Sequence, residues 1–422
     1  MSKVKISHLT KSISGELHLN GSKSISNRVL VIRALCGEDF DLENISSSKD
    51  SSTLIKLLKN EDTEQVFDAG HAGTTFRFLT AYFAIKDGKQ FLTGSHRMLQ
   101  RPIGPLVEAL NQLGANISYD QNKGYPPLQI ETPTGETGGE VSIRGDISSQ
   151  FLSALLLIGP YMDRGLTLNI DGELVSRPYL MMTINLMRHF GAELSFEDQK
   201  IVVKKGGYKA KDFFVEGDWS SASYLYEICA LADKAEIIVT GLSQNSLQGD
   251  SQVLGYFEQL GVNSEFLDGK LKLTKVPSFE KPEIIEFNLI EEPDLTQTIV
   301  CTCSGLGINS VYSGLKTLKI KETDRVAALT EELSKFQVFF TKLPDRFSEK
   351  QDDDFYMLSE RILPTEEEQE IDTYDDHRMA LAFAPLGLIK PITINNPEVV
   401  VKSYPEYWEH LKNLGFTLAF SE

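Results

Sequence analysis

The sequence predicts an α/β protein assembled from six similar units. A short apolar strand runs into a turn of Gly, Ser or Asp and then into a helix with apolar periodicity, and this pattern occurs six times. The six turns lie at Ser22, Gly70, Asp146, Asp218, Asp294 and Asp376. Strands that alternate with helices are typical of α/β folds. The intervals of 48, 76, 72, 76 and 82 residues exceed those of solenoid repeats, so each unit should hold several strands and helices.

The elements follow the same order in each unit. The strand-to-helix segments cover residues 16–35, 65–84, 141–159, 213–232, 287–307 and 370–388. Between them, residues 106–119, 184–197 and 252–267 each predict an amphipathic helix, a Gly turn and a strand. The first interval, of 48 residues, is shorter than the others, so we expect the first unit to be truncated.

Length and composition limit the class of protein. The chain has 422 residues, which predicts two or more domains. Hydrophobic residues make up 41% and charged residues 24%, as in globular proteins. With 42 basic and 60 acidic residues the net charge is −18, so we expect no nucleic-acid-coating surface. Residues 352–376 hold 11 acidic residues and one basic residue, and we interpret this stretch as a long, solvated loop.

The cysteines and the apolar runs indicate a cytoplasmic protein. Four cysteines in hydrophobic surroundings are too few for a disulfide framework, and we expect buried, reduced thiols. Cys301 and Cys303 would alternatively suggest a metal clip, but Cys and His partners at ligand spacing do not accompany them. The N-terminus does not resemble a signal peptide, and uninterrupted apolar runs of membrane-spanning length do not occur.

The six turns also predict anion binding. The first N–H groups of a helix lack internal partners and carry the positive end of the helix dipole. Several of these helix starts bear Lys, Arg, Ser or Gln within one turn. If the units are arranged symmetrically, the starts would converge on one cleft that binds anions. For any single copy, an ordinary helix cap is the alternative interpretation.

Two clusters in the first half of the chain suit anionic ligands. Lys23, Ser24 and Arg28 lie within about a turn and a half, although a solvated charged face is the alternative. Gly73 lets a ligand approach the backbone closely. Arg101, which precedes a proline, suits a bidentate contact with carboxylate or phosphate.

Neutral hydrogen-bonding groups stand beside these cations. They are Ser148, Ser149, Gln150 and Ser176, all at predicted helix starts. Neutral donors beside cations suit a ligand that has both hydroxyl and anionic groups.

The second half offers further charged groups. Lys321 and Arg325 are four residues apart with Glu322 beside them, and an exposed helix with salt bridges is the alternative. The run from Asp375 to Arg378 has the residue types of a metal site, but a second metal-ligand motif does not accompany it. Lys402 follows an apolar segment that we expect to be a strand.

Eight segments of the chain together resemble one enzyme family. They are GSKSISNR, GHAGTTFRFLTA, LTGSHRMLQRPIG, DISSQFLSALL, ELVSRPY, VEGDWSSASY, IKETDRVAAL and YDDHRMALAF, in this order. This set is similar to that of the 5-enolpyruvylshikimate-3-phosphate synthases, and the resemblance runs from about residue 5 to residue 415. It implies a two-domain, inside-out α/β barrel in which each domain is built from three βαβαββ repeats, with the active site in the interdomain cleft. One domain would be residues 21–215, and the other would join residues 1–20 to residues 216–422.

The resemblance also implies an activity. The family transfers the enolpyruvyl group of phosphoenolpyruvate to the 5-hydroxyl of shikimate 3-phosphate and releases phosphate, on the route to chorismate and aromatic amino acids. It implies a cytoplasmic monomer that needs neither a metal nor an organic cofactor and binds neither nucleic acid nor membrane. Lys23, Asp294 and Glu322 would be catalytic, with Asp294 as the base and Glu322 as the acid.

The remaining assignments by resemblance concern substrate binding. Shikimate 3-phosphate would be bound by Lys23, Ser24, Arg28, Ser148, Ser149, Gln150, Ser176, Asp294 and Lys321. Phosphoenolpyruvate would be bound by Lys23, Gly73, Arg101, Gln150, Arg325, Arg378 and Lys402.

Three positions depart from the family pattern, and two other functions compete. His71 replaces the usual Asn, Phe78 a frequent Pro, and Thr317 an Asn. The first two flank the phosphoenolpyruvate loop, where the inhibitor glyphosate competes. One alternative is the related transferase that acts on UDP-N-acetylglucosamine, which usually carries a Cys or an Asp in the loop here occupied by RMLQRPIG. The other is a non-catalytic shikimate 3-phosphate binder, which would lack Lys23, Asp294 or Glu322.

Overall fold

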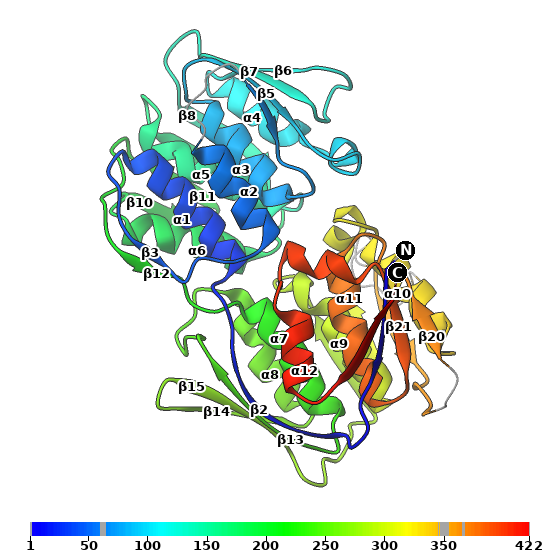
Figure 1. Ribbon diagram of the computed structural model, residues 1–422. Coiled ribbons are helices and arrows are strands. Elements are labelled where there is room, and N and C mark those ends of the chain that lie inside the picture. Colours follow the sequence, from blue (N-terminus) through cyan, green and yellow to red (C-terminus); the bar gives the residue numbers. More distant parts are fainter. Residues whose placement is uncertain (1, 60–64, 345, 347–353, 365–367, 422) are drawn as a thin grey trace. The chain divides into compact units, whose positions relative to one another are not determined.

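The computed structural model describes residues 2–59, 65–344, 346, 354–364 and 368–421. The chain divides into two compact units, shown in Figure 1. The N-terminal unit is Gly21–Val215, and the C-terminal unit joins Met1–Asn20 to Glu216–Glu422.

The described residues of the N-terminal unit form six α-helices. They are α1 (Lys23–Cys36), α2 (Lys49–Leu58), α3 (Gly73–Phe83), α4 (Gly104–Gln112), α5 (Ser149–Ile158) and α6 (Arg177–His189). Its strands are β3 (Leu42–Glu43), β4 (Val66–Asp68), β5 (Lys89–Thr93), β6 (Asn116–Tyr119), β7 (Leu128–Glu131), β8 (Gly139–Arg144), β9 (Leu166–Asp171), β10 (Leu194–Glu197), β11 (Lys200–Val203) and β12 (Phe213–Phe214). Short 3-10 helices are η1 (Met98–Gln100) and η2 (Gly159–Tyr161).

The C-terminal unit has the same kinds of elements. Its α-helices are α7 (Trp219–Leu231), α8 (Val253–Glu258), α9 (Thr296–Leu306), α10 (Arg325–Ser334), α11 (His377–Phe383) and α12 (Tyr407–Asn413). Its strands are β1 (Lys3–Ser7), β2 (Ser12–His18), β13 (Lys234–Thr240), β14 (Val262–Leu267), β15 (Lys270–Lys275), β16 (Ile284–Asn288), β17 (Asn309–Ser313), β18 (Phe339–Lys342), β19 (Tyr356–Ser359), β20 (Gln369–Ile371), β21 (Ile392–Asn395) and β22 (Thr417–Ser421). Its 3-10 helices include η3 (Gly249–Gln252), η4 (Pro293–Leu295), η5 (Lys316–Ile320), η7 (Ala384–Leu388) and η8 (Pro397–Lys402).

Five four-stranded sheets share one pairing pattern. In the sheet of β4, β5, β7 and β6, the first two strands are parallel, and β7 pairs antiparallel with both β5 and β6. The parallel pair is joined through α3, because parallel neighbours need a crossover connection. The sheets that contain β9, β13, β17 and β21 repeat this pattern. The predicted repetition of α/β units is therefore confirmed.

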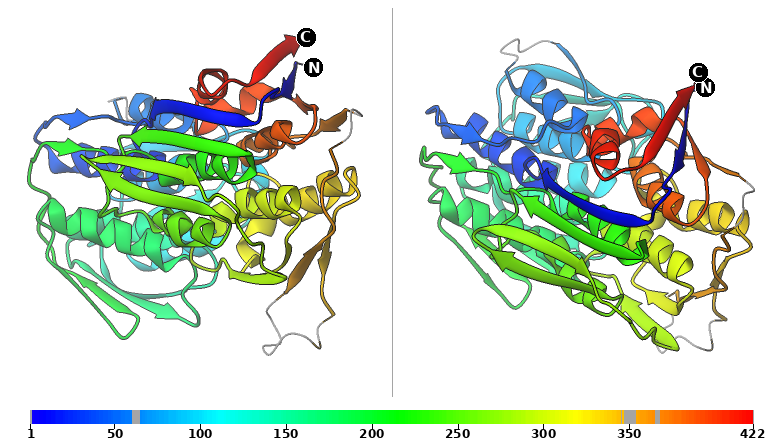
Figure 2. Two further views of the ribbon diagram at one scale, coloured as in Figure 1. Left: turned by 90° about the horizontal axis from the view of Figure 1, so that it is seen from below. Right: turned by 60° about the horizontal axis from the view of Figure 1, so that its bottom comes forward.

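The first and the last repeats differ in how their sheets are made. Among the described residues, which leave out 60–64, the first has a two-stranded sheet in which β3 is parallel to β12, without the antiparallel pair of the other sheets. In the last, the N-terminal strand β1 lies between β21 and β22, with Val4 opposite both Ile394 and Phe420. The described ends of the chain therefore lie side by side, as Figure 2 shows.

The first helix of each repeat is buried within its unit. In the C-terminal unit, α7, α9 and α11 pack against one another, and all seven residues of α11 are buried. In the N-terminal unit, α5 packs against α3, α6 and α1. Sheets surround these central helices, which is the inside-out arrangement that the family resemblance implies. A helix that is apolar on all sides is stable only in such a buried position.

Two expectations about the second half are wrong. The segment before Lys402 is the 3-10 helix η8 and not a strand. The acidic stretch 352–376 is not one long loop, because it contains β19 and β20. Tyr356 and Leu358 of β19 are buried between β17 and β18, and the Asp354 carboxylate pairs with two lysines. Part of this stretch, residues 352–353 and 365–367, lies outside the described residues.

Candidate functional site

Arg325 is the centre of the charged cluster in the C-terminal unit. It is the first residue of α10, whose start is capped by the Asp324 carboxylate. Its guanidinium donates to Asp376 from Nε at 2.7 Å, to Asp294 from Nη1 at 3.0 Å, and to Glu322 from Nη2 at 2.9 Å. Three carboxylates are thus held around one arginine, whose side chain is only 2% exposed.

Asp294 lies between two arginines and a lysine. Its Oδ1 accepts from Arg325, and its Oδ2 accepts from Nη2 of Arg378 at 2.8 Å. The ammonium of Lys321 lies 3.7 Å from Oδ1. Nη1 of Arg378 also donates to the Asp294 carbonyl at 3.1 Å and to the Tyr224 hydroxyl at 3.3 Å. The starts of α9, α10 and α11 therefore converge here, together with α7.

The charges in this cluster shift two pKa values. Burial alone would raise the pKa of the Asp294 carboxyl, but the charges of Arg378, Lys321 and Arg325 outweigh it and hold the pKa well below its ordinary value. Burial opposes the charge of Arg325, yet its neighbouring carboxylates raise the pKa of the guanidinium above its ordinary value. Asp294 is therefore ionised, and its lone pairs are held by cations.

Local sequence explains why these side chains meet. Asp376 caps α11 by accepting from the Arg378 N–H at 2.9 Å, and the same carboxylate binds Arg325. Lys402 ends η8, and its ammonium donates to the Asp375 carbonyl at 2.5 Å, next to this turn. The interpretation of Lys321 and Arg325 as an exposed helix with salt bridges is wrong, because α10 begins only at Arg325.

In the N-terminal unit, Arg28 is buried in a network of its own. Its Nε donates to Thr183 at 2.7 Å, and its Nη2 donates to Ser153 at 3.1 Å and to the Tyr179 carbonyl at 3.3 Å. Its Nη1 donates to the Ser24 carbonyl at 2.9 Å. Burial lowers the pKa of Arg28 to about 10. Most of its donors are therefore engaged inside the unit.

Contacts between first turns bring the helix starts of this unit together. Lys23 on α1 donates to the Asp50 carboxylate on α2 at 3.2 Å. The Asp50 carbonyl accepts from the hydroxyl of Thr75 on α3 at 3.2 Å. Gln150 on α5 donates to the hydroxyl of Thr74 on α3, also at 3.2 Å. The starts of α1, α3 and α5, three of the six predicted turns, are thus linked within this unit, together with the start of α2, which was not among the six.

Gly73 and Arg101 are in direct contact. Gly73 is the first residue of α3, and a Cβ placed on it would lie 2.5 Å from Nη1 of Arg101. Arg101 is 5% exposed. The absence of a side chain at Gly73 therefore lets the guanidinium lie against the backbone N–H groups at the start of α3, where an anion would find both.

The predicted serines cap two other helices. Ser148 caps α5 by accepting from the Gln150 N–H at 3.3 Å, and Ser149 is the first residue of that helix. Ser176 precedes α6 in the left-handed region, with a φ of 53°. These neutral groups stand at the same helix ends as Gln150 and Tyr179.

The three departures from the family pattern differ in burial: His71 is exposed, Phe78 is buried and Thr317 is half-buried. His71 is within 3.1 Å of the Ser95 hydroxyl through Nδ1. Phe78 is buried, and the guanidinium of Arg28 lies 5.5 Å from the centre of its ring. The buried hydroxyl of Thr317 on η5 has no hydrogen-bond partner among the described residues.

Sequence reasoning missed three residues of these clusters. From the sequence, Asp376 is interpreted as a turn and as part of a run with the residue types of a metal site, but not as a partner of Arg325. The signal for its capping role is an Asp directly before His377 and Arg378. Asp50 lies in a run of serines that predicts a helix start. Tyr224 lies in the second turn of α7, and the sequence gives no signal that its hydroxyl faces Arg378.

The sequence also predicts buried, reduced thiols and no membrane-spanning segment. All four cysteines are free, and Cys229, Cys301 and Cys303 are buried, whereas Cys36 is half-buried. Burial raises the pKa of the Cys303 thiol to about 11. In the described part of the chain, none of the helices has the length and apolar character needed to cross a membrane.

Comparison with known proteins decides the family. The model of the EPSP synthase family (3-phosphoshikimate 1-carboxyvinyltransferase) matches residues 57–411. The chain belongs to the EPSP synthase family. A 3-phosphoshikimate 1-carboxyvinyltransferase of Bacteroides fragilis is 44% identical over 412 residues, which cover 97% of both chains. One of Vibrio campbellii is 38% identical and covers 96% of this chain and 97% of its own length.

Solved structures show the same fold. The EPSP synthase of Acinetobacter baumannii matches with a TM-score of 0.76 at 20% identity and full coverage of both chains. The enolpyruvyl transferase NikO of Streptomyces tendae matches with a TM-score of 0.74 at 14% identity, over 100% of this chain and 99% of its own. As an EPSP synthase, the enzyme transfers the enolpyruvyl group of phosphoenolpyruvate to shikimate 3-phosphate in the shikimate pathway, which leads to chorismate and the aromatic amino acids.

Proposed function

We propose that Asp294 and Glu322 carry the two proton transfers of the EPSP synthase reaction, and that the cations around them hold the substrates. The observation that carries this proposal is that two carboxylates contact one buried arginine, Arg325. Both carboxylates are partly exposed, at 19% for Asp294 and 21% for Glu322, so a substrate can reach them. Separate acid and base groups suit a cycle in which one proton leaves oxygen and another joins carbon.

The chemical steps balance through these two groups. Asp294 takes the proton of the 5-hydroxyl while that oxygen forms a bond to C2 of phosphoenolpyruvate. Glu322 gives its proton to C3, which becomes a methyl group, and a tetrahedral intermediate results. In the second step the C–O bond to phosphate breaks, Glu322 takes one proton back from the methyl group, and the proton on Asp294 leaves with the phosphate. The enolpyruvyl ether and phosphate are released, and both carboxyl groups are restored.

The cations match the charges of the two substrates. Each substrate carries one carboxylate and one phosphate, so four anionic groups must be held side by side. Arg325, Arg378 and Lys402 are proposed to bind phosphoenolpyruvate, and Lys321 shikimate 3-phosphate. Guanidinium groups suit these anions because their donors bind carboxylate and phosphate in pairs.

The N-terminal unit is proposed to supply the remaining contacts. Gly73, Arg101 and Gln150 would bind phosphoenolpyruvate, and their support is the contact of Arg101 with Gly73 and the bond from Gln150 to Thr74. Lys23 would touch both substrates. The groups proposed to hold shikimate 3-phosphate are Lys23, Ser24, Arg28, Ser148, Ser149, Gln150 and Ser176.

Substrate binding would convert Asp294 into an effective base. A carboxylate whose pKa is held low by three cations is a weak base. The same cations, Arg378, Lys321 and Arg325, are the proposed partners of substrate anions. Once a substrate anion shares these cations, the pKa of Asp294 must rise towards its ordinary value. A substrate anion at Arg325 would likewise compete with Glu322 for the guanidinium. Once Glu322 is released from the arginine, its carboxylate can take up a proton.

Phosphate release tests this assignment. Purified enzyme should release phosphate from phosphoenolpyruvate only when shikimate 3-phosphate is added, and in D2O the product should carry deuterium in its methylene group. Glu322→Gln should lose both signals while both substrates still bind. Deuterium incorporation that continues in Glu322→Gln at the wild-type rate would contradict the role of Glu322.

We also propose that the enzyme works as a cytoplasmic monomer without a metal or organic cofactor. Its four free thiols support a reducing compartment. Asp376 belongs to the run from Asp375 to Arg378 that has the residue types of a metal site, and its carboxylate is already engaged with Arg325 and with the N–H of Arg378. Sedimentation at several protein concentrations and turnover in the presence of a chelator test these two statements.

A further inference from the structure

We propose that the C-terminal unit has a second binding site, for a small organic carboxylate with an apolar body, at the end of the unit opposite Arg325. The site is a cavity of about 410 Å³ where α7, α9 and the η7 segment after α11 end. The same three chain segments begin near Arg325, and α7 has 13 residues. At a rise of 1.5 Å per residue, the two sites are about 20 Å apart.

The cations of this cavity come from four separate segments. They are Lys11, Lys275, Lys281 and Arg361, and among the described residues that line the cavity the acidic one is Asp233. The cavity therefore has a surplus of positive charge in a chain whose net charge is −18. An anion is the ligand that such a surplus attracts.

Two of the cations also have a structural role. Lys275 donates to the Ala230 carbonyl near the end of α7, and Lys281 donates to the Leu306 carbonyl at the end of α9 at 2.5 Å. Lysines often stabilise helix ends in this way. Each ammonium has three donors, however, so one carbonyl does not saturate it. Burial lowers the pKa of Lys275, and the nearby charge of Lys281 also lowers it, while Cys229 and Asp233 act in the opposite direction. An anion beside both lysines would offset the repulsion between their charges.

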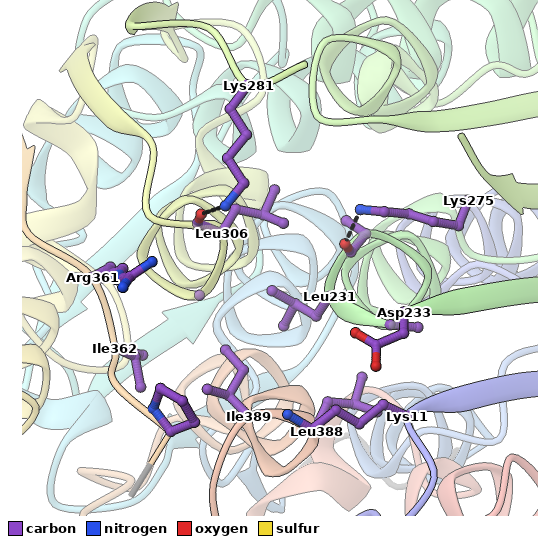
Figure 3. A pocket seen from close by; sticks show the side chains of 14 residues that line it. Lys11, Leu231, Asp233, Lys275, Lys281, Leu306, Arg361, Ile362, Leu388 and Ile389 are labelled. Carbon is purple, nitrogen blue, oxygen red and sulfur yellow. Dashed lines mark hydrogen bonds between the residues drawn. The ribbon is translucent and has the colours of Figure 1, made fainter. Parts of the chain in front are cut away.

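The floor of the cavity is apolar, and it is the smaller part of a lining that is mostly polar. Leu231, Leu306, Ile362, Leu388 and Ile389 line it. Figure 3 shows Leu231 and Ile389 between Lys275 on one side and Arg361 on the other. Arg361 is exposed, so its guanidinium can reorient towards a ligand. An apolar floor with a few charged groups at the rim fits a carboxylate attached to a ring or chain better than it fits a bare inorganic anion.

A titration with 4-fluorobenzoate, followed by 19F NMR on the full-length enzyme, tests the proposal. Saturable binding is expected, and the neutral isostere 4-fluorobenzamide should bind at least about tenfold more weakly, a difference of about 1.4 kcal/mol. Inorganic phosphate should not displace the probe at equal concentration. Phosphate that displaces it as well as unlabelled benzoate does would overturn the part played by the apolar floor.

Variants distinguish this cavity from the substrate site. Lys275→Met and Arg361→Met should each weaken probe binding at least about tenfold and leave turnover unchanged, which also shows that both variants fold. Lys270→Met is the matched control, since Lys270 lies on the same strand, β15, outside the cavity. Lys321→Met controls for binding at the substrate site. No saturable binding, or a loss in either control as large as in Lys275→Met, would overturn the proposal.

Discussion

Arg325 and Asp376 form a buried ion pair in which Nε of the arginine lies 2.7 Å from Oδ2 of the aspartate. A second bond joins Nη2 to Oδ1 at 3.3 Å, and the Asp376 side chain is fully buried. The pair orients the guanidinium so that its other donors contact Asp294 and Glu322. Asp376 is therefore a positioning residue, which acts through the arginine.

Removal of the Asp376 carboxylate should destabilise the protein strongly. Asp376→Ala leaves a buried guanidinium with one partner fewer and removes the cap of α11, so we expect the free energy of unfolding to fall by about 3–5 kcal/mol. Asp39→Ala, at a side chain that is 93% exposed, should change it by no more than about 0.5 kcal/mol. Urea denaturation of both variants measures this, and equal stabilities would contradict the structural role of the pair.

The Tyr224 hydroxyl should matter for phosphoenolpyruvate binding. It lies 3.3 Å from Nη1 of Arg378, and burial raises its pKa to about 12, so it stays neutral at working pH. Tyr224→Phe removes one contact that orients the arginine, and a hydrogen bond to a charged group is worth about 1.5–3 kcal/mol. We expect KM for phosphoenolpyruvate to rise about tenfold or more, with a smaller change in KM for shikimate 3-phosphate. Steady-state kinetics that show equal changes in both would refute a specific role.

Gly73→Ala should displace Arg101. The new Cβ would lie 2.5 Å from Nη1, so the guanidinium must move away from the start of α3. Affinity for phosphoenolpyruvate should fall about tenfold, which corresponds to 1.4 kcal/mol. Gly37→Ala is a poor control because φ there is +75°, whereas Gly206→Ala has open space around it and an ordinary φ. Unchanged phosphoenolpyruvate binding in Gly73→Ala would contradict the proposed contact.

Glu227 should make the stability depend on pH. It is buried on α7, and neither of its carboxyl oxygens has a hydrogen-bond partner among the described residues. Burial raises the pKa of Glu227 well above its ordinary value of 4.5, so the folded state keeps a proton that the unfolded state releases. Stability is therefore lost as the pH rises above about 4.5, with a slope of up to 1.4 kcal/mol per pH unit until the folded-state pKa is reached.

The matched variant for this prediction is Glu227→Gln, which has the same shape and does not titrate. Denaturant unfolding at pH 6 and pH 9 should show a smaller loss of stability with pH in Glu227→Gln than in the wild type. Parallel pH profiles of the two proteins would show that Glu227 does not titrate in this range.

The fold was predictable to the level of repeated units because periodicity is a local signal. The strand-turn-helix segments of the sequence correspond to β2 with α1, β4 with α3, and β8 with α5 in the structure. The sequence did not show that β1 completes the sheet of β21 and β22, because that pairing joins residues about 400 apart. Nor did it show the strand β19 within an acidic stretch, since Tyr356 and Leu358 offer only a short alternation.

The residues of the candidate site were predictable where a motif matched the family. The contacts between these residues were less predictable. Arg325 lies in a motif of the resemblance and Asp294 at a predicted repeat turn, but their contact spans 31 residues of chain. Arg28 was expected to hold shikimate 3-phosphate, and the structure shows most of its donors engaged with Thr183, Ser153 and backbone carbonyls. The tertiary fold decides which side chains accept hydrogen bonds from a given arginine. The spacing of residues along the sequence does not determine it.

The most direct test of the account is the turnover number of Asp294→Asn and Glu322→Gln, measured together with the binding of both substrates. General acid or base catalysis is worth about 10²–10⁴ in rate, so each variant should lose at least about 10² in kcat. Binding of phosphoenolpyruvate and shikimate 3-phosphate should survive, because the cations remain. A kcat within about threefold of the wild type in either variant would contradict the assignment of that carboxylate as a proton-transfer group.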